Sequence, residues 1–236
     1  MSRFMRILST VLLCFFSSLS AASDFIDFET SANQMSSYYR AYIFFDGDRK
    51  YKESILAITS NASNYDELLS EKPQLLSQWH KLVDQVNQVL DDDTNIRNVN
   101  TQAHWELKLG DLNRTLKEEV GNGAYNELLK DPKSAAYLRL LLLRMEKTLA
   151  LYMALTNPVG GLGLSAETPD LDTKIIEVSD MLALIDVENI SLKRVVKKWN
   201  FIKKVLLKYK TETAPFIVLH SYKKIRVDMN NHLATL

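Results

Sequence analysis

The sequence contains almost no cysteine: among its 236 residues there is only Cys14, close to the N-terminus. A single cysteine cannot form an internal disulfide, so the stability of the fold must come from the burial of apolar side chains. Histidine is sparse too, and its four residues are scattered singly at His80, His104, His220 and His232. None of them has a second histidine or a cysteine at the spacing of a metal-binding helix, so we predict no metal site and no cofactor.

Glycine and proline are also few, with seven and five residues. The stretch 157–169, NPVGGLGLSAETP, contains three of these glycines and two of the prolines. Such a cluster is typical of a loop or boundary, and we assign residues 158–170 to a Gly/Pro loop. Ser165 lies in this loop but lacks the second glycine of a nucleophile elbow, and the Glu-x-x-His pairs of di-iron bundles are absent. The sequence therefore favours a non-enzymatic function.

Long hydrophobic runs are missing from most of the chain. The N-terminus has a basic start, an apolar run over Ile7–Phe16 and small residues up to Ala22, which together indicate a signal peptide over residues 1–22. This run is shorter than the ~20 residues that span a bilayer, and the apolar segment 137–155 is interrupted by charged residues. We therefore expect a soluble mature chain without a transmembrane segment, located in the periplasm or secreted.

Apolar residues spaced by three or four are abundant, and this spacing indicates amphipathic helices. With no alternation of strands and helices, we predict an all-α fold, an antiparallel bundle of about six to seven helices. Residues 23–157 form the bundle, and residues 171–236 form a basic helical part packed on it. The segment 215–230 is rich in β-branched and aromatic residues, so helix and strand both remain open there. The first predicted helix covers 31–60 with an interruption at 46–48. A second helix starts at Pro73, a third ends at Gly121 and a fourth starts after Pro132. The last three predicted helices are 171–186, 191–210 and 215–230.

The net charge of zero hides an asymmetry. Residues 23–170 contain 15 Lys/Arg and 22 Asp/Glu, whereas residues 171–236 contain 12 and 7. Residues 191–210 contain eight basic and no acidic side chains, and at 100° per residue most of the basic ones lie opposite an apolar face. We predict that this basic side binds a protein partner or an anionic envelope surface, and we expect no nucleic acid partner because the chain is exported and neutral overall. The predicted surface consists of Lys193, Arg194, Lys197, Phe201, Lys204 and Lys208.

Two other interpretations remain open. The basic side of 191–210 is also typical of a core helix whose lysines are solvated and balanced by the acidic segment 23–170. Alternatively, the protein is a small-ligand carrier or an enzyme with a pocket between helices. That pocket would be lined by Tyr38, Tyr42, Trp79 and Trp105.

The tripeptide His104-Trp105-Glu106 brings two polar groups next to an aromatic one. Adjacent residues of a helix point in different directions, so these side chains cannot form one site. We expect Trp105 in the core, between two surface groups.

Residues 38–51, YYRAYIFFDGDRKY, resemble the arginine, tyrosine, Gly-Asp and tyrosine pattern in the first helix of extracytoplasmic four-helix sensor domains of bacterial receptors. The resemblance implies a helical domain that binds a ligand or a receptor. Because the sequence has no second membrane segment and no signalling domain, we expect a soluble relative and no direct signalling. Tyr38, Tyr42 and Phe45 share one helical stripe and are expected in the core, with a solvated kink at Asp46 and Asp48.

Overall fold

The computed structural model describes residues 3–92, 98–121, 125–156, 170–185 and 188–236, with side chains from Asp24 onward. Over these residues every regular element is helical, which confirms the predicted all-α fold. Apart from Asp170, the predicted Gly/Pro loop 158–170 lies outside the described residues. The α-helices are α1 (Arg3–Phe44), α2 (Arg49–Thr59), α3 (Asp66–Leu69), α4 (Pro73–Asp91), α5 (Val99–Val120), α6 (Ala135–Thr156), α7 (Leu171–Ala183), α8 (Ile190–Leu206) and α9 (Pro215–Leu233), with short 3-10 turns at Ala62–Tyr65 and Glu127–Lys130.

Several helix ends follow directly from the sequence. Pro73 occupies the first turn of α4, where a missing N–H is tolerated, and Gly121 ends α5 with a φ of 80°. The segment left open between helix and strand is the helix α9, which Pro215 begins. Its fully buried residues Val218, Tyr222, Ile225 and Met229 recur at spacings of three and four, as helical packing requires.

The predicted interruption at 46–48 is a complete chain reversal. Asp46 and Gly47 both have positive φ values, 54° and 85°, a conformation that glycine adopts freely and aspartate tolerates. The Asp48 carboxylate then accepts a hydrogen bond from the Lys50 N–H at 2.9 Å and caps α2. The reversal divides the first predicted segment into α1 and α2, and with α3 it gives the described chain more helices than the six to seven predicted.

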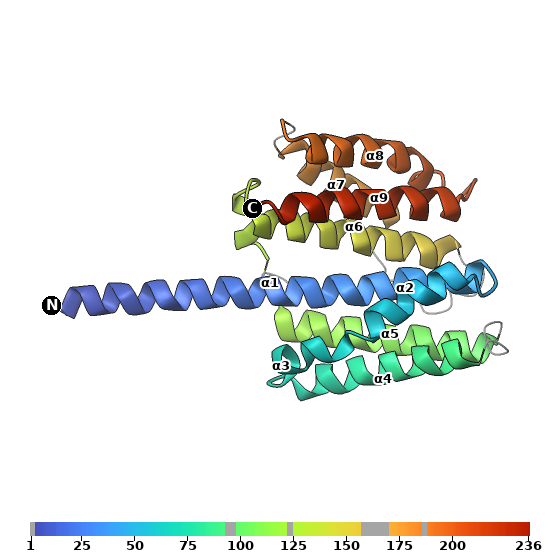
Figure 1. Ribbon diagram of the computed structural model, residues 1–236, viewed down its shortest axis with the longest axis horizontal. Coiled ribbons are helices and arrows are strands. Elements are labelled where there is room, and N and C mark those ends of the chain that lie inside the picture. The colour runs from blue at the N-terminus through green and yellow to red at the C-terminus, as the bar shows by residue number, and fades with distance from the viewer. Residues whose placement is uncertain (1–2, 93–97, 122–124, 157–169, 186–187) are drawn as a thin grey trace.

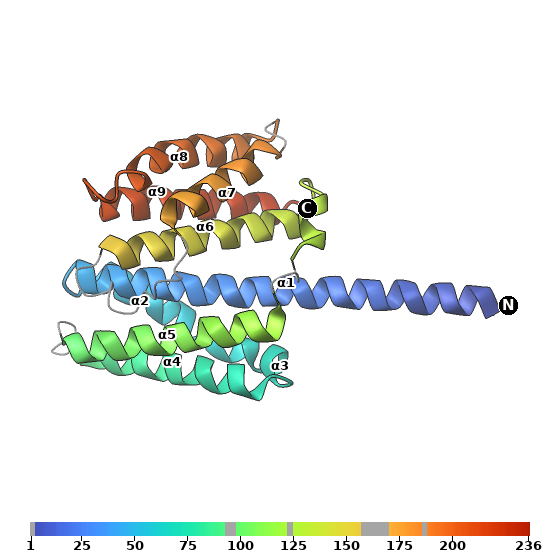
Figure 2. The ribbon, with the colours of Figure 1, turned by 180° about the vertical axis from the view of Figure 1, so that it is seen from behind.

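Helix α1 runs between two groups of helices, with α2 to α5 on one side and α6 to α9 on the other (Figures 1 and 2). Its N-terminal part extends beyond the ends of the other helices. Ile26 and Phe28, near the point where α1 meets the other helices, are both fully buried. Helix α6 packs against α1 and also contacts α7 and α9, while α8 packs against α9. The position of α8 therefore depends on how α9 and α6 are held on α1.

The two groups of helices are joined by a buried charge pair. Arg40 of α1 donates two parallel hydrogen bonds to Glu106 of α5, from Nε to Oε1 at 2.9 Å and from Nη2 to Oε2 at 2.6 Å. Its Nη1 also donates to the Ser36 hydroxyl and to the Ala150 carbonyl of α6. The two charged side chains are only 5% and 8% exposed. One guanidinium thus connects α1, α5 and α6.

Glu106 corrects the prediction of two surface groups around Trp105. His104 is exposed and Trp105 is buried, as expected, but Glu106 is buried as well. The prediction considered only the directions of neighbouring side chains on their own helix. The Glu106 carboxylate can be buried because Arg40, which is distant in sequence, neutralises it and supplies both hydrogen bonds.

A second buried charge pair fixes α9 against the same core. Glu146 of α6 is fully buried and accepts hydrogen bonds from Arg226 of α9 at 2.7 Å and from Gln34 of α1 at 3.0 Å. Burial raises the pKa of the Glu146 carboxyl, and the ion pair with Arg226 opposes this effect. The Arg226 guanidinium also donates to the Tyr38 hydroxyl and lies over the rings of Tyr38 and Tyr222. Helix α9 is therefore held by directional contacts as well as by its apolar face.

The Arg40–Glu106 contact leads to a stability prediction. Arg40→Met leaves a buried carboxylate without its two donors, so we expect the free energy of unfolding to fall by about 3–5 kcal/mol in urea titrations. The matched control is Arg49→Met, which removes an exposed pair with Glu53 and should change stability by less than about 1 kcal/mol. Equal, small losses in the two variants would contradict the structural role given to Arg40.

Candidate functional site

Helix α8 is fixed to the protein through one face. Asn189 caps its N-terminus by accepting hydrogen bonds from the N–H groups of Ser191 and Leu192. Trp199 is buried, and its Nε1 donates to the Ser179 hydroxyl of α7 at 3.2 Å. On the side facing α9, the Lys198 ammonium pairs with the Asp228 carboxylate. The buried residues of this face are Leu192, Val195, Trp199, Ile202 and Leu206.

The opposite face of α8 is basic and exposed. We call it the basic face of α8 and define it as Lys193, Arg194, Lys197, Phe201 and Lys204, all of which are exposed. None of the four cationic side chains forms an ion pair with any residue that the structure describes. Phe201 lies among them with 54% of its surface exposed. The structure thus places five of the six predicted surface residues together on one outward side.

Lys208, the sixth predicted residue, differs from the others. It lies beyond the C-cap residue Leu207 of α8, and its ammonium is 3.6 Å from the Glu212 carboxylate. Both side chains are largely exposed, so this pair contributes little to stability. It does supply Lys208 with a local acidic partner, whereas the other four basic residues have none among the residues that the structure describes.

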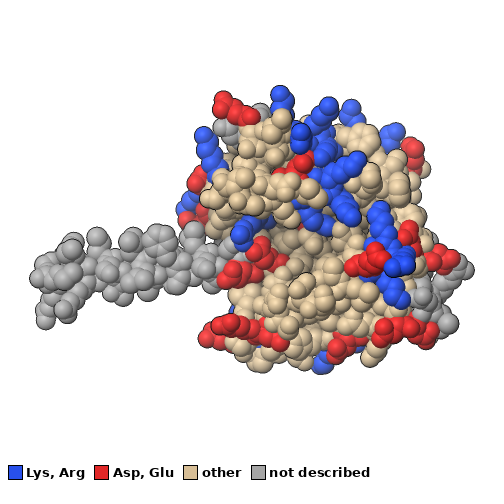
Figure 3. Space-filling model, in the orientation of Figure 1, with Lys and Arg blue, Asp and Glu red and all other residues tan. Residues whose placement is uncertain are grey.

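The basic and acidic parts of the sequence occupy different parts of the structure. On the face shown in Figure 3, lysines and arginines gather over α8 and α9, while acidic side chains follow the edge formed by the α4 and α5 side of the protein. The acidic segment 23–170 forms no ion pair with Lys193, Arg194, Lys197 or Lys204 among the described residues. Among the described residues these four side chains are thus solvated, and the interpretation of α8 as a core helix with a solvated lysine face stays open.

The predicted ligand-pocket residues lie in separate surroundings. Trp79 is buried and packs edge-on against Phe28, with ring centroids 5.2 Å apart. Trp105 packs against Tyr39 at 4.3 Å, and Tyr42 is fully buried.

Tyr38, the fourth of these residues, is engaged by Arg226 of α9. None of the four lines either of the two pockets described next. The ligand pocket between helices stays a prediction.

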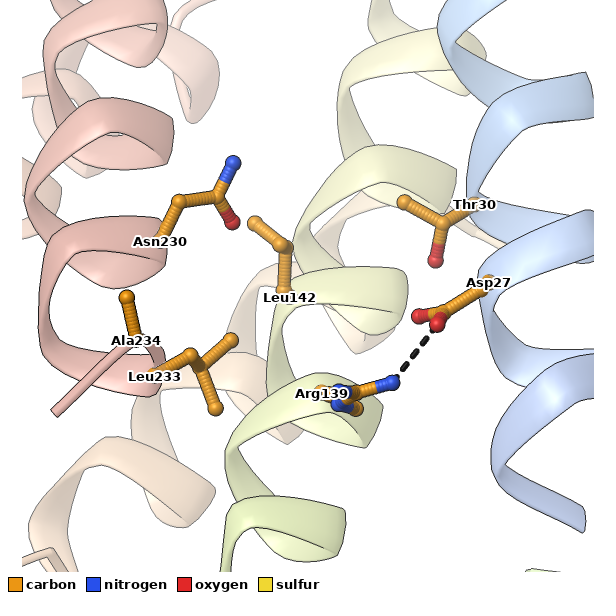
Figure 4. Close-up of a pocket in the computed structure, with 7 residues that line it drawn as sticks. All are labelled: Asp27, Thr30, Arg139, Leu142, Asn230, Leu233 and Ala234. Atoms are coloured by element: carbon orange, nitrogen blue, oxygen red, sulfur yellow. Dashed lines mark hydrogen bonds and ion pairs between the residues drawn. The ribbon is translucent and has the colours of Figure 1, made fainter. Parts of the chain in front are cut away.

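One pocket lies where α1, α6 and α9 meet and has a volume of about 290 Å³ (Figure 4). Asp27 and Arg139 form an ion pair at 2.6 Å on one side of it, and Asn230 lies on the other. Burial raises the pKa of the Asp27 carboxyl, while Arg139 opposes the shift. Because these two charges neutralise each other, the pocket offers hydrogen-bonding groups without an uncompensated charge.

A second pocket, of about 430 Å³, lies on the exposed face of α9. The sequence analysis missed it because its residues come from α2, α8 and α9, and no spacing along the chain relates them. Its lining residues are Lys50, Lys198, His220, Lys223, Lys224, Val227 and Asp228.

No group of three or more His, Cys, Asp or Glu side chains among the described residues is placed to hold a metal ion. No helix in the same residues combines the length and the apolar character required to cross a membrane.

Comparison with known proteins gives no further assignment. No protein-family model, no curated protein and no solved structure matches the chain. Within the segment 38–51 that resembles sensor domains, Arg40 is used in the buried pair with Glu106. The candidate site is therefore described from the positions and charges of its own residues, and no residue role is taken from a relative.

The exposure of Phe201 leads to a second prediction. Phe201→Ala should leave the free energy of unfolding within about 0.5 kcal/mol of the parent, because the side chain has little packing to lose. Trp199→Ala, two positions away on the buried face, should lower it by about 3–5 kcal/mol. Both values come from chemical denaturation, and a loss of several kcal/mol for Phe201→Ala would assign this residue to the core.

Proposed function

We propose that this chain is an exported, non-enzymatic helical-bundle protein that binds an anionic partner through the basic face of α8. The partner is the acidic surface of another protein or the anionic surface of the envelope. One observation carries the proposal: four exposed cations without a described acidic partner surround an exposed phenylalanine.

The chemistry of this face suits such a partner. Surfaces that only need solubility intersperse charges of both signs, whereas α8 contains no acidic residue from Ile190 to Leu206. Each lysine or arginine near an anionic membrane surface contributes about 1 kcal/mol of attraction. Phe201 adds apolar area that an interface can bury, and aromatic residues are enriched at such interfaces. Electrostatic attraction then brings the partners together, and burial of the ring prolongs the contact.

Export through a signal peptide over residues 1–22 is part of the proposal. The new N-terminus would be Ser23, followed by Asp24 and Asp27 in the first turns of α1. Serine is a favoured N-cap residue, and carboxylates near a helix N-terminus interact favourably with the helix dipole. Ile26 begins the part of α1 that is buried in the core. Cleavage after Ala22 would thus leave a helix start with its own stabilising residues.

Export gives the third prediction. Peptide mapping by mass spectrometry of the protein purified from the extracytoplasmic fraction should find a mature chain that begins near Ser23. The purified 23–236 chain should show the same melting temperature as the full chain, because the core begins after the cleavage point. Recovery of an extracytoplasmic protein that retains Met1 through Ala22 would rule out the proposed cleavage.

Charge reversal on α8 gives the fourth prediction. Replacing Lys193, Lys197 and Lys204 by Glu should leave folding nearly intact, since exposed charges contribute little individually. Binding of the mature chain to vesicles that contain anionic lipid, or capture of a protein from native envelope extracts, should fall by about a hundredfold or more. In the parent, binding should also weaken as ionic strength rises.

The matched control carries the same charge change on the other side of α1. Lys81, Lys108 and Lys117 lie on α4 and α5, and replacing all three by Glu alters the net charge equally. This control should bind almost as well as the parent. Equal binding by the parent and the α8 variant would end the proposal, and loss of vesicle binding alone would identify the envelope surface as the partner.

A further inference from the structure

The second pocket, which we call the α9 pocket, contains more positive charge than the described residues neutralise. Lys198 is paired with Asp228, the only carboxylate among the lining residues. Lys50, Lys223 and Lys224 form no ion pair with the described residues. Three ammonium groups from two helices therefore line one concavity without a carboxylate partner in the described part of the chain.

The pocket is built on fixed elements. The Asp48 cap sets the start of α2 and hence the position of Lys50. The Lys50 ammonium lies 5.3 Å from the Tyr51 ring centroid and 5.6 Å from that of Phe216, contacts that orient a cation but leave its charge uncompensated. His220 stacks on Phe216, with centroids 6.0 Å apart and ring planes within 5°. On the opposite side, Lys198 is held by Asp228.

We propose that this pocket binds a phosphate monoester. A phosphate monoester carries close to two negative charges at neutral pH and has three acceptor oxygens, so several ammonium groups can engage it from different directions. A carboxylate has one charge and two oxygens, and would leave part of the cluster uncompensated. Lysine is an established phosphate-binding residue.

The rest of the pocket accepts the organic part of the ligand. Its volume of about 430 Å³ lies in the range of small-molecule sites, about 300–1,000 Å³. Val227 supplies an exposed apolar wall. This inference goes beyond the proposed function, because the pocket is formed mainly by α9, and its one residue from α8, Lys198, is not part of the basic face of α8.

Two sources of a phosphate monoester are distinguished by two binding experiments. In the first, isothermal titration calorimetry measures the binding of glycerol 3-phosphate and of inorganic phosphate to the mature chain. In the second, sedimentation measures binding to phosphatidylcholine vesicles that contain either phosphatidic acid, a monoester, or phosphatidylglycerol, a diester, at equal surface charge. Saturable binding in the first experiment identifies a soluble phosphate compound. A preference for phosphatidic acid in the second identifies a lipid headgroup.

The test variant is Lys223→Gln/Lys224→Gln, and Lys81→Gln/Lys117→Gln on α4 and α5 is the control with the same loss of charge. The test variant should weaken the soluble interaction by about tenfold or more, or abolish the preference for phosphatidic acid. The control should keep the soluble affinity within about twofold and keep the lipid preference, since it leaves the pocket and the basic face of α8 intact. The inference is wrong if neither experiment shows specific binding, or if both variants reduce it equally. The α8 charge reversal tests the proposed function separately, so failure of one proposal is not failure of the other.

Discussion

The bidentate contact between Arg40 and Glu106 constrains the whole arrangement of helices. It lies where α1 passes between the two groups, and the same guanidinium reaches the backbone of α6. Separating α5 from α1 would leave a buried charge without its partner, and separating α6 would remove the Ala150 carbonyl acceptor. Loss of one partner of a buried ion pair costs about 3–5 kcal/mol. We therefore regard this contact as the feature that sets how the two groups sit on the central helix. The buried apolar side chains then pack around this contact.

The candidate binding surface follows from the same constraint. Arg226 and Glu146 hold α9 on α6 and α1, Asp228 of α9 holds Lys198, and Trp199 reaches α7. In these contacts, Lys198 of α8 faces α9 and Trp199 of α8 faces α7. The remaining cations, among them Lys193 and Lys197, point outward with no described acidic partner. A rigid support therefore presents a charge of one sign, which suits a surface whose partner lies outside the protein.

The sequence predicted what depends on local periodicity and little of what depends on pairing between helices. The apolar spacing in 191–210 correctly separated the buried face of α8 from its basic face, and Pro73 and Gly121 correctly marked helix ends. Glu106 was misassigned because its partner lies on another helix, 66 residues away in sequence.

The α9 pocket was missed for the same reason. Lys50 and Lys223 belong to helices that meet only in the folded protein, through the reversal at Asp46 and Gly47. The aromatic residues chosen for a ligand pocket were selected by residue type, and Trp79 and Trp105 are instead used in core packing.

Lysine footprinting of the mature chain tests the central claim most directly. The protein is acetylated with and without native envelope extract, and the modification of each lysine is measured by mass spectrometry. The account predicts that the partner protects Lys193, Lys197 and Lys204 while Lys81 and Lys117 on α4 and α5 react as before. Protection of Lys81 and Lys117 with unchanged reactivity on α8 would contradict it and place the binding surface on the opposite side of the protein.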